Sequence, residues 1–334
     1  MMKAFIMKRY GKKEPLYAID VPEPTISDHE VLVQIHATAV NVLDAKIKSG
    51  EFKALLAYRT PLILGHDLAG TVLRVGQQVQ GFKVGDEVYA RPADYRIGTF
   101  AQLIAVHQDD LAIKPSTISM QEAASIPLVG LTAWQALIDK ANLQKGQKVF
   151  IQAGSGGVGT FAIQLAKHLG ATVATTAGTS NVQLVKDLGA DIVIDYKKED
   201  FEKILRDYDV VLHSQDAETL EKSLRILKPG GKLISISGPP DPDYAKQAGL
   251  PWFMKIVMGM LSWRARASAK RQQASFSFLL MKANGKQLRE ISQLIDSGII
   301  RPVVDRVFPF ESTNEALEYV EQGRSKGKVV IRVK

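Results

Sequence analysis

Short, continuous apolar runs alternate with helical patterns through the middle of this chain. Residues 149–151 form an apolar run typical of a central parallel strand buried on both faces. Residues 161–169 then carry an apolar helical stripe, which Gly170 ends. The alternation continues with strands predicted at Thr172–Thr176, Asp191–Asp195, Asp209–Leu212 and Lys232–Ile236, and helices at Asn181–Leu188 and Ala217–Leu227. This order predicts an α/β protein with a doubly wound parallel sheet.

The two ends of the chain carry a different, irregular and β-rich pattern. Strands are predicted at 31–35, 67–75 and 88–90, and nearby prolines exclude helices from much of this region. Further on, the pattern predicts a broken helix over 121–140, a helix stop and turn at Lys228–Gly231, a sixth strand at Ser275–Met281, a helix over 287–297 and a last strand at Lys328–Val333. We therefore expect a β-rich domain from residues 1–122 and 284–334, interrupted by a parallel-sheet domain over 123–283.

Three glycines, Gly154, Gly156 and Gly159, lie between the first of these strands and its helix with the spacing G-x-G-x-x-G. A β-carbon there would hold the backbone away from a pyrophosphate, whose negative charge favours the exposed N–H groups at a helix start. A tight structural turn is the alternative interpretation. Because the strand and the helix are both in place, the motif favours a dinucleotide site. The loop would supply Gly154, Ser155, Gly156, Gly157, Val158 and Gly159.

Composition narrows the class of protein. The chain has 334 residues with ordinary apolar and charged fractions, which fits a globular protein of two domains. It contains no cysteine, so disulfides and thiolate chemistry are excluded, and with no N-terminal secretory pattern we expect a cytoplasmic protein. The net charge is +8. Residues 244–289 hold nine Lys or Arg and no acid, so this one segment supplies the whole excess of basic over acidic residues. Nucleic-acid binding by the whole chain is not supported.

Four stretches together resemble one family: Gly65–Val72, Val84–Val88, Gly130–Trp134 and Ala153–Gly159. In this order and spacing they resemble the medium-chain dehydrogenase/reductase superfamily, specifically its zinc-free quinone oxidoreductase branch, over nearly the whole chain. The resemblance implies a GroES-like β domain with a Rossmann domain inserted into it. It further implies hydride transfer from a reduced nicotinamide to a quinone or to the β-carbon of an enone. It also implies a homodimer joined through the sheet edge at Ser275–Met281.

The resemblance also bears on metal binding. Zinc-dependent members of the superfamily hold a catalytic zinc at three positions that match Asn41, His66 and Leu128 here. Only His66 is a zinc ligand, whereas a catalytic site needs three protein donors and a water. We therefore expect no metal, and expect His66, Leu128 and Asn41 to line the substrate pocket. Without zinc a simple carbonyl is not polarised strongly, but quinones and enones spread the developing charge and need only a hydrogen-bond donor.

NADPH is the expected cofactor. Enzymes that select NAD carry an Asp or Glu about twenty residues past the first glycine, but residues 172–179 contain no acid. Asn181 stands where relatives often have Lys, and residues 213–217 depart from the acidic residue and glycines of relatives. Besides the glycine loop, the resemblance places these residues beside the cofactor: Thr132, Thr176, Ser180, Asn181, Tyr196, Ser237, Gly238 and Lys328.

The candidate catalytic residues are Asn41, Asp44 and Tyr58, the first two of which match the family's Asn-x-x-Asp. Asn41 is either a donor to the substrate oxygen or a side chain that stabilises a turn. Asp44 is expected to orient its neighbours or to support the fold. Tyr58 is either a proton donor or one wall of the pocket.

The apolar segment Gly249–Trp263, followed by four basic residues, has three interpretations. It is a mobile lid whose Trp252 and Phe253 line the substrate pocket, a helix buried in the domain or against a partner subunit, or a surface helix with weak contact to an anionic membrane at 249–271. Two functions besides quinone or enone reduction stay open. These are reduction of an enoyl thioester, and a non-catalytic role in binding RNA or a membrane surface.

Overall fold

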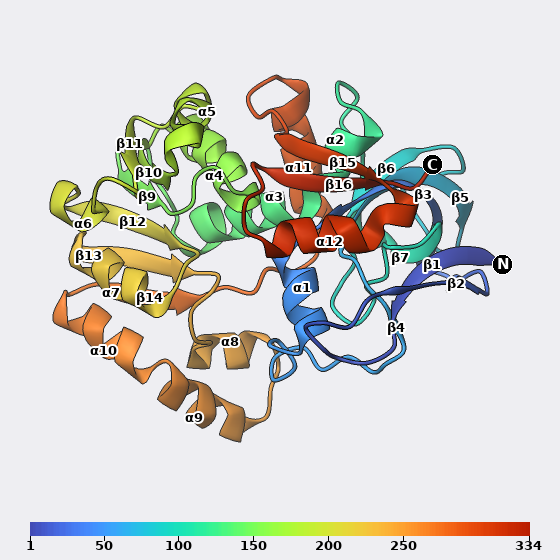
Figure 1. The fold of residues 1–334 in the computed structure, drawn as a ribbon, viewed down its shortest axis with the longest axis horizontal. Coiled ribbons are helices and arrows are strands. Elements are labelled where there is room, and N and C mark those ends of the chain that lie inside the picture. The colour runs from blue at the N-terminus through green and yellow to red at the C-terminus, as the bar shows by residue number, and fades with distance from the viewer. The chain divides into compact units, whose positions relative to one another are not determined.

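The computed structural model describes all residues from 1 to 334, which form two compact units (Figure 1). The first unit comprises Met1–Leu131 and Lys282–Lys334, and the second comprises Thr132–Met281. The sequence pattern placed these divisions at 122/123 and 283/284. The helix α3, Pro127–Trp134, runs across the first division, so the boundary lies inside a continuous helix and not at its start.

The second unit is built on a six-stranded, fully parallel sheet in the order β11-β10-β9-β12-β13-β14. The strands are β9 (Lys148–Ile151), β10 (Thr172–Ala177), β11 (Ile192–Asp195), β12 (Tyr208–His213), β13 (Leu227–Ser235) and β14 (Ser275–Phe278). Val149, Phe150 and Ile151 are fully buried, as expected for a strand covered on both faces. The predicted doubly wound sheet is therefore confirmed, with β14 at its edge.

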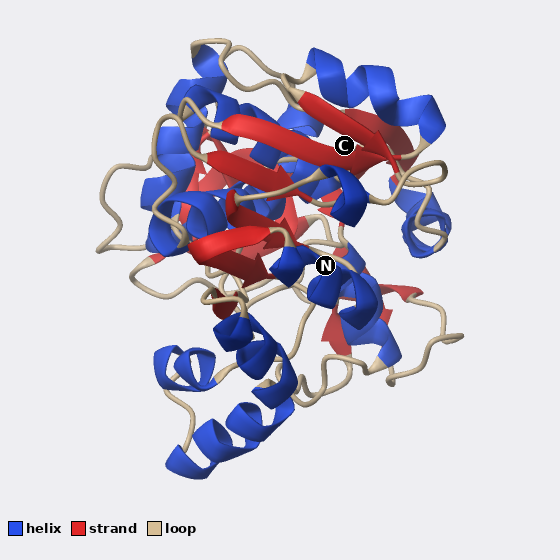
Figure 2. Ribbon diagram, turned by 90° about the vertical axis from the view of Figure 1, so that its left-hand side faces the viewer, coloured by secondary structure: helices blue, strands red, loops and turns tan.

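Helices flank this sheet. They are α4 (Gly157–His168), α5 (Val182–Asp187), α6 (Phe201–Ile204), α7 (Ala217–Arg225), α8 (Pro242–Gln247), α9 (Trp252–Leu261) and α10 (Trp263–Arg271), with a π-helix at Gln135–Lys140 and a 3₁₀ turn at Thr179–Asn181. One apolar core joins α6, α7 and α10 to one face of the sheet through Phe150, Phe201, Leu224 and Ala265. Figure 2 shows the helices in blue around the strands in red.

The helix stop and turn predicted at Lys228–Gly231 is wrong as a boundary. These residues lie inside β13 and do not separate a helix from the strand. Pairing with β12 jumps from Tyr208 opposite Leu227 to Val210 opposite Lys232. The four intervening residues therefore form an irregularity in the strand, and Gly230 there has φ +80°. The proline and glycines mark a turn-like conformation, but the strand starts before it.

The first unit holds a seven-stranded sheet with the path β15-β16-β3-β5-β6-β8 and β7 paired with β3, and a three-stranded sheet β2-β1-β4. The strands are β1 (Met2–Met7), β2 (Tyr17–Val21), β3 (Glu30–Val40), β4 (Leu62–Ile63), β5 (Asp67–Val75), β6 (Glu87–Ala90), β7 (Leu103–His107), β8 (Leu111–Ile113), β15 (Val304–Pro309) and β16 (Lys328–Arg332). The alternating side chains Val31, Val33 and Ile35 of β3 share one core with Leu68 and Val72 of β5.

The C-terminal part of the chain returns to the first unit, as predicted. β16 pairs antiparallel with β3, so Val330 lies opposite Ala39. The helices of this unit are α1 (Val42–Ser49), α2 (Met120–Ala124), most of α3, α11 (Gly285–Asp296) and α12 (Thr313–Glu321), with 3₁₀ turns at Gln108–Asp110 and Phe310–Ser312. None of the helices in the chain combines the length and the apolarity needed to cross a bilayer.

Candidate active site

The three glycines of the loop after β9 differ in what a β-carbon on each of them would meet. A β-carbon on Gly159 would lie 2.3 Å from the carbonyl oxygen of Ala153, and one on Gly154 would lie 2.1 Å from the hydroxyl of Thr175. Internal packing therefore explains these two glycines. Gly156 differs, because its β-carbon would meet only the Ala153 oxygen, at 3.3 Å. A β-carbon on Gly156 would therefore require only a small shift of the turn, so packing within the turn does not explain this glycine.

The start of α4 presents unpaired donors beside Gly156, which caps the helix in an extended conformation. The N–H groups of Gly157, Val158 and Gly159 donate to no acceptor within the protein. Aligned amides at the first turn of a twelve-residue helix attract negative charge. The residues present thus fit a dinucleotide pyrophosphate.

Several residues expected beside the cofactor gather around this loop. The Asn181 amide donates to the hydroxyl of Ser155 over 3.3 Å, and the Ser180 hydroxyl lies 3.4 Å from Asn181 Oδ1. Thr176, at the carboxyl end of β10, accepts from the Ala153 N–H at 3.1 Å. Four residues predicted from sequence are therefore brought together at the carboxyl ends of the parallel strands.

The end of β11 adds Asp195, Lys197 and Lys198, which the sequence reasoning did not name as site residues, next to the predicted Tyr196. Asp195 lies opposite Ala177 in the sheet and accepts from the Thr179 hydroxyl at 2.6 Å. That hydrogen bond, with Lys198 at 3.7 Å, lowers the pKa of the carboxyl. Tyr196 follows with its ring 62% exposed, and Lys197 and Lys198 are exposed beside it. Neighbouring parallel strands bring their carboxyl ends together, so Asp195 was predictable from the strand order.

At the ends of β12 and β13, His213 joins the two strands. Its Nε2–H donates to the Asp216 carbonyl at 3.0 Å, so Nδ1 accepts from the Ser235 hydroxyl at 2.8 Å. Burial lowers the pKa of His213 to about 4, so the imidazole is neutral at physiological pH. Ser237 donates to the Gln215 carbonyl at 2.6 Å, and the Gly238 N–H donates to Ser235 at 2.7 Å. The unusual residues after β12 therefore hold the Ser237–Gly238 turn.

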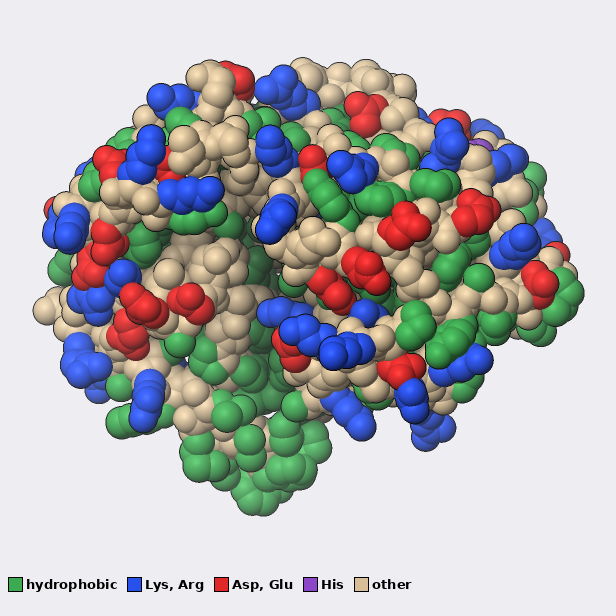
Figure 3. All heavy atoms as spheres, viewed as in Figure 1, with side chains coloured by type: hydrophobic (Ala, Val, Ile, Leu, Met, Phe, Trp, Pro, Cys, Tyr) green, Lys and Arg blue, Asp and Glu red, His purple; other side chains and the backbone are tan.

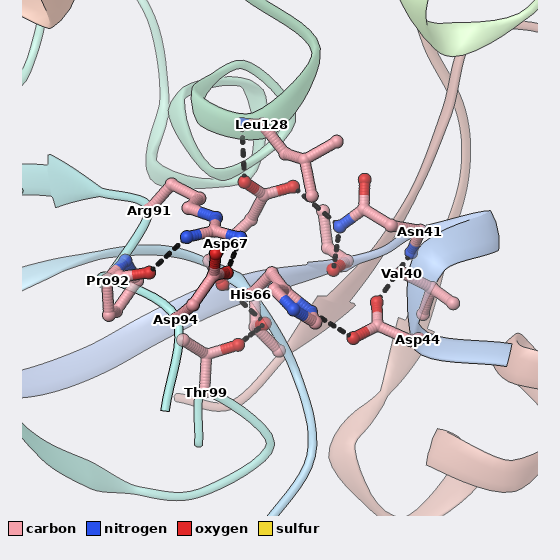
Figure 4. Close-up of polar contacts among 12 residues, drawn as sticks. Val40, Asn41, Asp44, His66, Asp67, Arg91, Pro92, Asp94, Thr99 and Leu128 are labelled. Carbon is pink, nitrogen blue, oxygen red and sulfur yellow. Dashed lines mark hydrogen bonds and ion pairs between the residues drawn. The ribbon is translucent and has the colours of Figure 1, made fainter. Parts of the chain in front are cut away.

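A second cluster of polar residues lies inside the first unit (Figure 4). Asn41 directly precedes α1, and its backbone N–H donates to Asp44 at 2.8 Å. Asp44 also contacts Nδ1 of His66 at 2.6 Å. Both Asp44 and His66 are fully buried. Asp44 thus fixes the start of the helix and the orientation of the imidazole together.

Asp67 is the centre of this cluster, and the sequence reasoning missed it although it follows His66 directly. One carboxylate oxygen accepts from the Leu128 N–H at 2.7 Å. The other accepts from the Asn41 amide at 2.9 Å and from Lys328 at 3.0 Å. A fully buried acid at the first position of an apolar strand was the signal available in the sequence.

Lys328, expected beside the cofactor, lies buried in this cluster. Its ammonium group contacts the Oδ1 of Asn41, Asp67 and the Val40 carbonyl, the last at 3.3 Å. The Asn41 amide nitrogen donates to Asp67 and, at 3.4 Å, to the Ala39 carbonyl. Every polar atom of the Asn41 side chain therefore has a partner within the protein, which favours the structural interpretation of this residue.

The donor set around His66 does not fit a zinc ion. Nδ1 is occupied by Asp44, while Nε2 is buried without a hydrogen-bond partner. Nowhere in the chain do three or more His, Cys, Asp or Glu side chains form a group that could hold a metal ion. Asn41 and Leu128 occupy the two other positions of the zinc triad, and neither supplies a strong zinc ligand.

Tyr58 lies in a cluster of aromatic residues in the first unit, with its ring centre 5.2 Å from that of Tyr95. Its hydroxyl accepts weakly from the Tyr95 N–H at 3.5 Å. Burial, reinforced by the nearby charge of Asp94, raises the pKa of the phenol well above its usual value. The side chain is therefore a hydrogen-bond donor, not a base, at any physiological pH.

The remaining predicted residues lie at different depths. Leu128 and Thr132 are both buried in α3, on either side of the division between units. Trp252 and Phe253 lie on α9 in the second unit, with 75% and 50% of their surfaces exposed. The structure does not bring these two rings together with Asn41, His66 or Leu128 inside one unit.

Comparison with known proteins supports one class. A model of the alcohol dehydrogenase GroES-like domain matches residues 27–116, and a model of zinc-binding dehydrogenases matches residues 188–331. The chain is 36% identical to 2-methylene-furan-3-one reductase of Solanum lycopersicum, over 99% of this chain and 79% of that protein. It is 34% identical to the chloroplastic NADPH-dependent alkenal/one oxidoreductase of Arabidopsis thaliana, with the same coverage. The quinone oxidoreductase structure from Coxiella burnetii superposes with a TM-score of 0.85 at 30% identity, over 100% of this chain and 99% of that one.

Fold, glycine loop and relatives together define an NAD(P)H-dependent oxidoreductase. The chain belongs to the medium-chain dehydrogenase/reductase superfamily, among its quinone oxidoreductase and alkenal/one reductase-like members. The expected GroES-like and Rossmann architecture and the expected family are both confirmed. The matched family model is described as zinc-binding, but in this chain Asn41 and Leu128 stand at two of the three zinc-ligand positions, and neither is a zinc ligand.

Proposed function

We propose that this protein transfers a hydride from NADPH to a quinone or to the β-carbon of an α,β-unsaturated carbonyl, without a metal ion. Bound NADPH supplies the hydride, and for an enone the matching proton reaches the α-carbon from water. The protein's own residues bind the dinucleotide, orient the acceptor and donate a hydrogen bond to its oxygen. The observation that carries the proposal is the glycine loop, with its open Gly156 and the unpaired amides of α4.

Two features support NADPH over NADH. The carboxyl end of β10 carries Thr176 and no acid, so a 2′-phosphate would not meet a carboxylate there. The acid of the next strand, Asp195, is hydrogen-bonded to Thr179 and faces Lys198. The exposed residues Tyr196, Lys197 and Lys198 are the nearest groups that would stack on or neutralise the extra phosphate.

The donor set supports an electron-poor acceptor. Neither Asn41 nor Leu128 is a zinc ligand, and the Asn41 side chain is committed to Asp67 and Lys328. We assign the donor role to Tyr58, whose hydroxyl hydrogen has no acceptor in the protein and whose raised pKa keeps it protonated. A single hydrogen bond suffices for an enolate or hydroquinone oxygen, whereas an isolated alkoxide needs more stabilisation, because conjugation has already spread the charge.

A substrate panel tests the proposal. Naphthoquinones, short enals and enoyl thioesters are each offered with NADPH and with NADH, with and without a chelator. We expect turnover of quinone or enal, a higher kcat/KM for NADPH, and no effect of chelation. A preference for the thioester would assign the alternative activity, enoyl-thioester reduction. Turnover of a simple alcohol, or loss of activity on chelation, would contradict the metal-free mechanism.

A single substitution tests the proposed donor role of Tyr58. Tyr58→Phe keeps the ring in its aromatic cluster and removes only the hydroxyl. We expect kcat to fall about a hundredfold to a thousandfold, as for loss of one hydrogen-bond donor to a developing oxyanion, while the Kd for NADPH stays the same. Unchanged kcat would return Tyr58 to the role of a pocket wall.

We also propose that two copies join through the exposed edge of the six-stranded sheet. β14 has a neighbouring strand, β13, on one side only, and although its Phe278 N–H already donates to Asp241, a strand edge without a partner strand is a ready template for a second chain. Sedimentation should then give twice the chain mass of 36.7 kDa, and the backbone amides of Ser275–Phe278 should be protected from exchange. The absence of cysteine supports our proposal of a reducing compartment such as the cytoplasm.

A further inference from the structure

The helices α9 and α10, here called the α9–α10 segment (Trp252–Arg271), expose an unusual amount of apolar surface. Seven large apolar side chains within twelve residues lie at the surface: Trp252, Phe253, Ile256, Val257, Met260, Leu261 and Trp263. Met258 is the one large apolar side chain of α9 that is buried. Figure 3 shows a broad apolar area in green over α9, at the lower edge of the molecule. A contiguous patch of this kind marks an interaction surface.

The same segment carries only positive charge. Lys255, Arg264, Arg266, Lys270 and Arg271 are all exposed, and none of them forms an ion pair. No acid occurs between residues 244 and 289. Of the nearby acids, Glu221 accepts from Ser268 and Asp241 accepts from the Tyr244 and Phe278 N–H groups, while Asp243 on α8 is exposed and forms no ion pair. The five cations of the segment therefore have no ion-pair partner in the protein.

Apolar and basic groups meet at one place on the segment. A groove of about 410 Å³ is lined by Ile256, Gly259, Met260 and Trp263. An Arg266 guanidinium nitrogen lies 3.8 Å from the β-carbon position of Gly259. A long apolar ligand part in the groove would thus place a negative group next to Arg266. This pairing of an acyl chain with an anionic head is the chemistry of a phospholipid.

We propose that the α9–α10 segment docks this protein on an anionic phospholipid bilayer, with α9 lying in the interface. Ten residues of α helix extend about 15 Å, half of the hydrocarbon thickness, so α9 lies along the surface and does not span it. Trp, Phe, Leu and Met on one side with Lys and Arg beside them form the composition that such helices share. Trp252, at the start of α9, and Trp263, at the start of α10, suit the headgroup level.

A second copy of the chain fits this surface less well than a bilayer does. A two-fold interface brings the same patch of both copies together. Here that contact would place five unpaired cations of one copy against five of the other, with no acid of the segment to separate them. An anionic bilayer satisfies the cations and the apolar side chains at once.

Vesicle flotation tests the proposal with the full chain. Vesicles of phosphatidylcholine alone and with 30% phosphatidylglycerol are compared at low and at 0.5 M salt. We expect binding to the anionic vesicles, a loss at high salt because charge is screened, and a blue shift of tryptophan emission from Trp252 and Trp263. The double variant Arg264→Gln/Lys270→Gln should bind about twenty-five-fold more weakly, at about fivefold per charge.

Two further variants make the result specific. Lys186→Gln/Lys203→Gln removes the same charge from exposed positions of the same unit and should bind like the unmodified protein. Ile256→Ser/Met260→Ser keeps every charge and should weaken binding at least tenfold, because both exposed side chains lose their apolar contact. Equal binding to neutral vesicles, equal loss in both charge variants, or a dimer that only Ile256→Ser/Met260→Ser dissociates would overturn the proposal. The last outcome would assign the surface to a second copy.

Discussion

Lys328 shows how one buried cation holds a candidate site together. It lies 5% exposed and contacts Asp67, Asn41 and the Val40 carbonyl, while Asp67 also binds the first turn of α3 through the Leu128 N–H. The pair therefore links the last strand of the chain to α1, β5 and α3 of the same unit. A charge buried in this way stabilises the structure only while all of its partners remain.

Removing the Lys328 cation alone should therefore lower the stability of the folded protein. Lys328→Met leaves Asp67 buried without its counter-ion, and we expect a loss of about 3 kcal/mol or more in the free energy of unfolding. Urea denaturation measures it, with Lys326→Met as a control that removes the same charge from an exposed position nearby. The double variant Asp67→Asn/Lys328→Met should recover part of the loss. Equal stability of Lys328→Met and Lys326→Met would show that the pair contributes nothing.

His213 makes stability depend on pH. Its pKa is about 4 in the folded protein, where burial disfavours the charged imidazole, against about 6.5 in an unfolded chain. Because the folded pKa is the lower one, the stability that depends on a neutral His213 is fully present above about pH 6.5. It is lost as pH falls towards 4, where the unfolded chain alone takes up the proton. The total loss is about 3 kcal/mol.

The variant His213→Gln should remove this dependence while its amide retains hydrogen bonds to Ser235 or Asp216. The free energy of unfolding, measured by urea titration at pH 7.5 and pH 5, should fall less steeply with acid in the variant than in the unmodified protein. Parallel curves for the two proteins would place the acid sensitivity elsewhere.

At the scale of elements, the glycine loop separates residues needed for folding from one needed for binding. Gly159 packs against the Ala153 carbonyl, whereas a β-carbon on Gly156 would meet only the Ala153 oxygen, at 3.3 Å, in a backbone conformation that alanine adopts readily. Gly159→Ala should lower the melting temperature by several degrees, since a β-carbon at 2.3 Å from an oxygen forces the turn to move.

Gly156→Ala should keep the melting temperature of the apo protein and raise the Kd for NADPH at least tenfold, because its β-carbon points to where the pyrophosphate approaches. Calorimetry and thermal melts of both variants decide the matter. A Gly156→Ala protein that binds NADPH normally would mean that the open side of the loop is not the dinucleotide site.

The element scale also shows what the sequence was able to predict. The strands around β9 and the helix α4 follow from local apolar periodicity, and β5 begins and ends at the predicted residues 67–75. The second half of β13 was predicted, but its start at Leu227 was not, because Pro229 and two glycines look like a turn although pairing with β12 begins before them. The proline and glycines determine the local turn-like conformation, whereas pairing with β12 makes Leu227 part of the sheet.

The candidate site was predictable only where it is local. Ser155 follows from the glycine motif, whereas Asn181 and Thr176 follow from the family resemblance. Lys328 and Asp67 meet across 261 residues of sequence, and only the pairing of β16 with β3 and of β3 with β5 brings them together. Without that topology, Lys328 was interpreted as a cofactor contact and Asp67 was passed over.

On the scale of the whole molecule, charge and apolar surface gather on one segment. Residues 244–289 contribute nine basic residues, and the 34 others in the chain are balanced by 35 acids. The reductase function needs no such asymmetry, which is why we assign the α9–α10 segment to a lipid surface and not to catalysis. A bilayer would also concentrate apolar quinones near the enzyme.

The central claim is that hydride moves from NADPH to the far end of a conjugated double bond without help from a metal. Deuterium transfer tests it most directly: the protein is incubated with a short enone and NADPH labelled at either face of C4, in the presence of excess chelator. We predict that one of the two labels appears at the β-carbon of the saturated ketone, at the same rate with and without the chelator. Label at the carbonyl carbon of an alcohol, or no transfer once the chelator is present, would contradict the account.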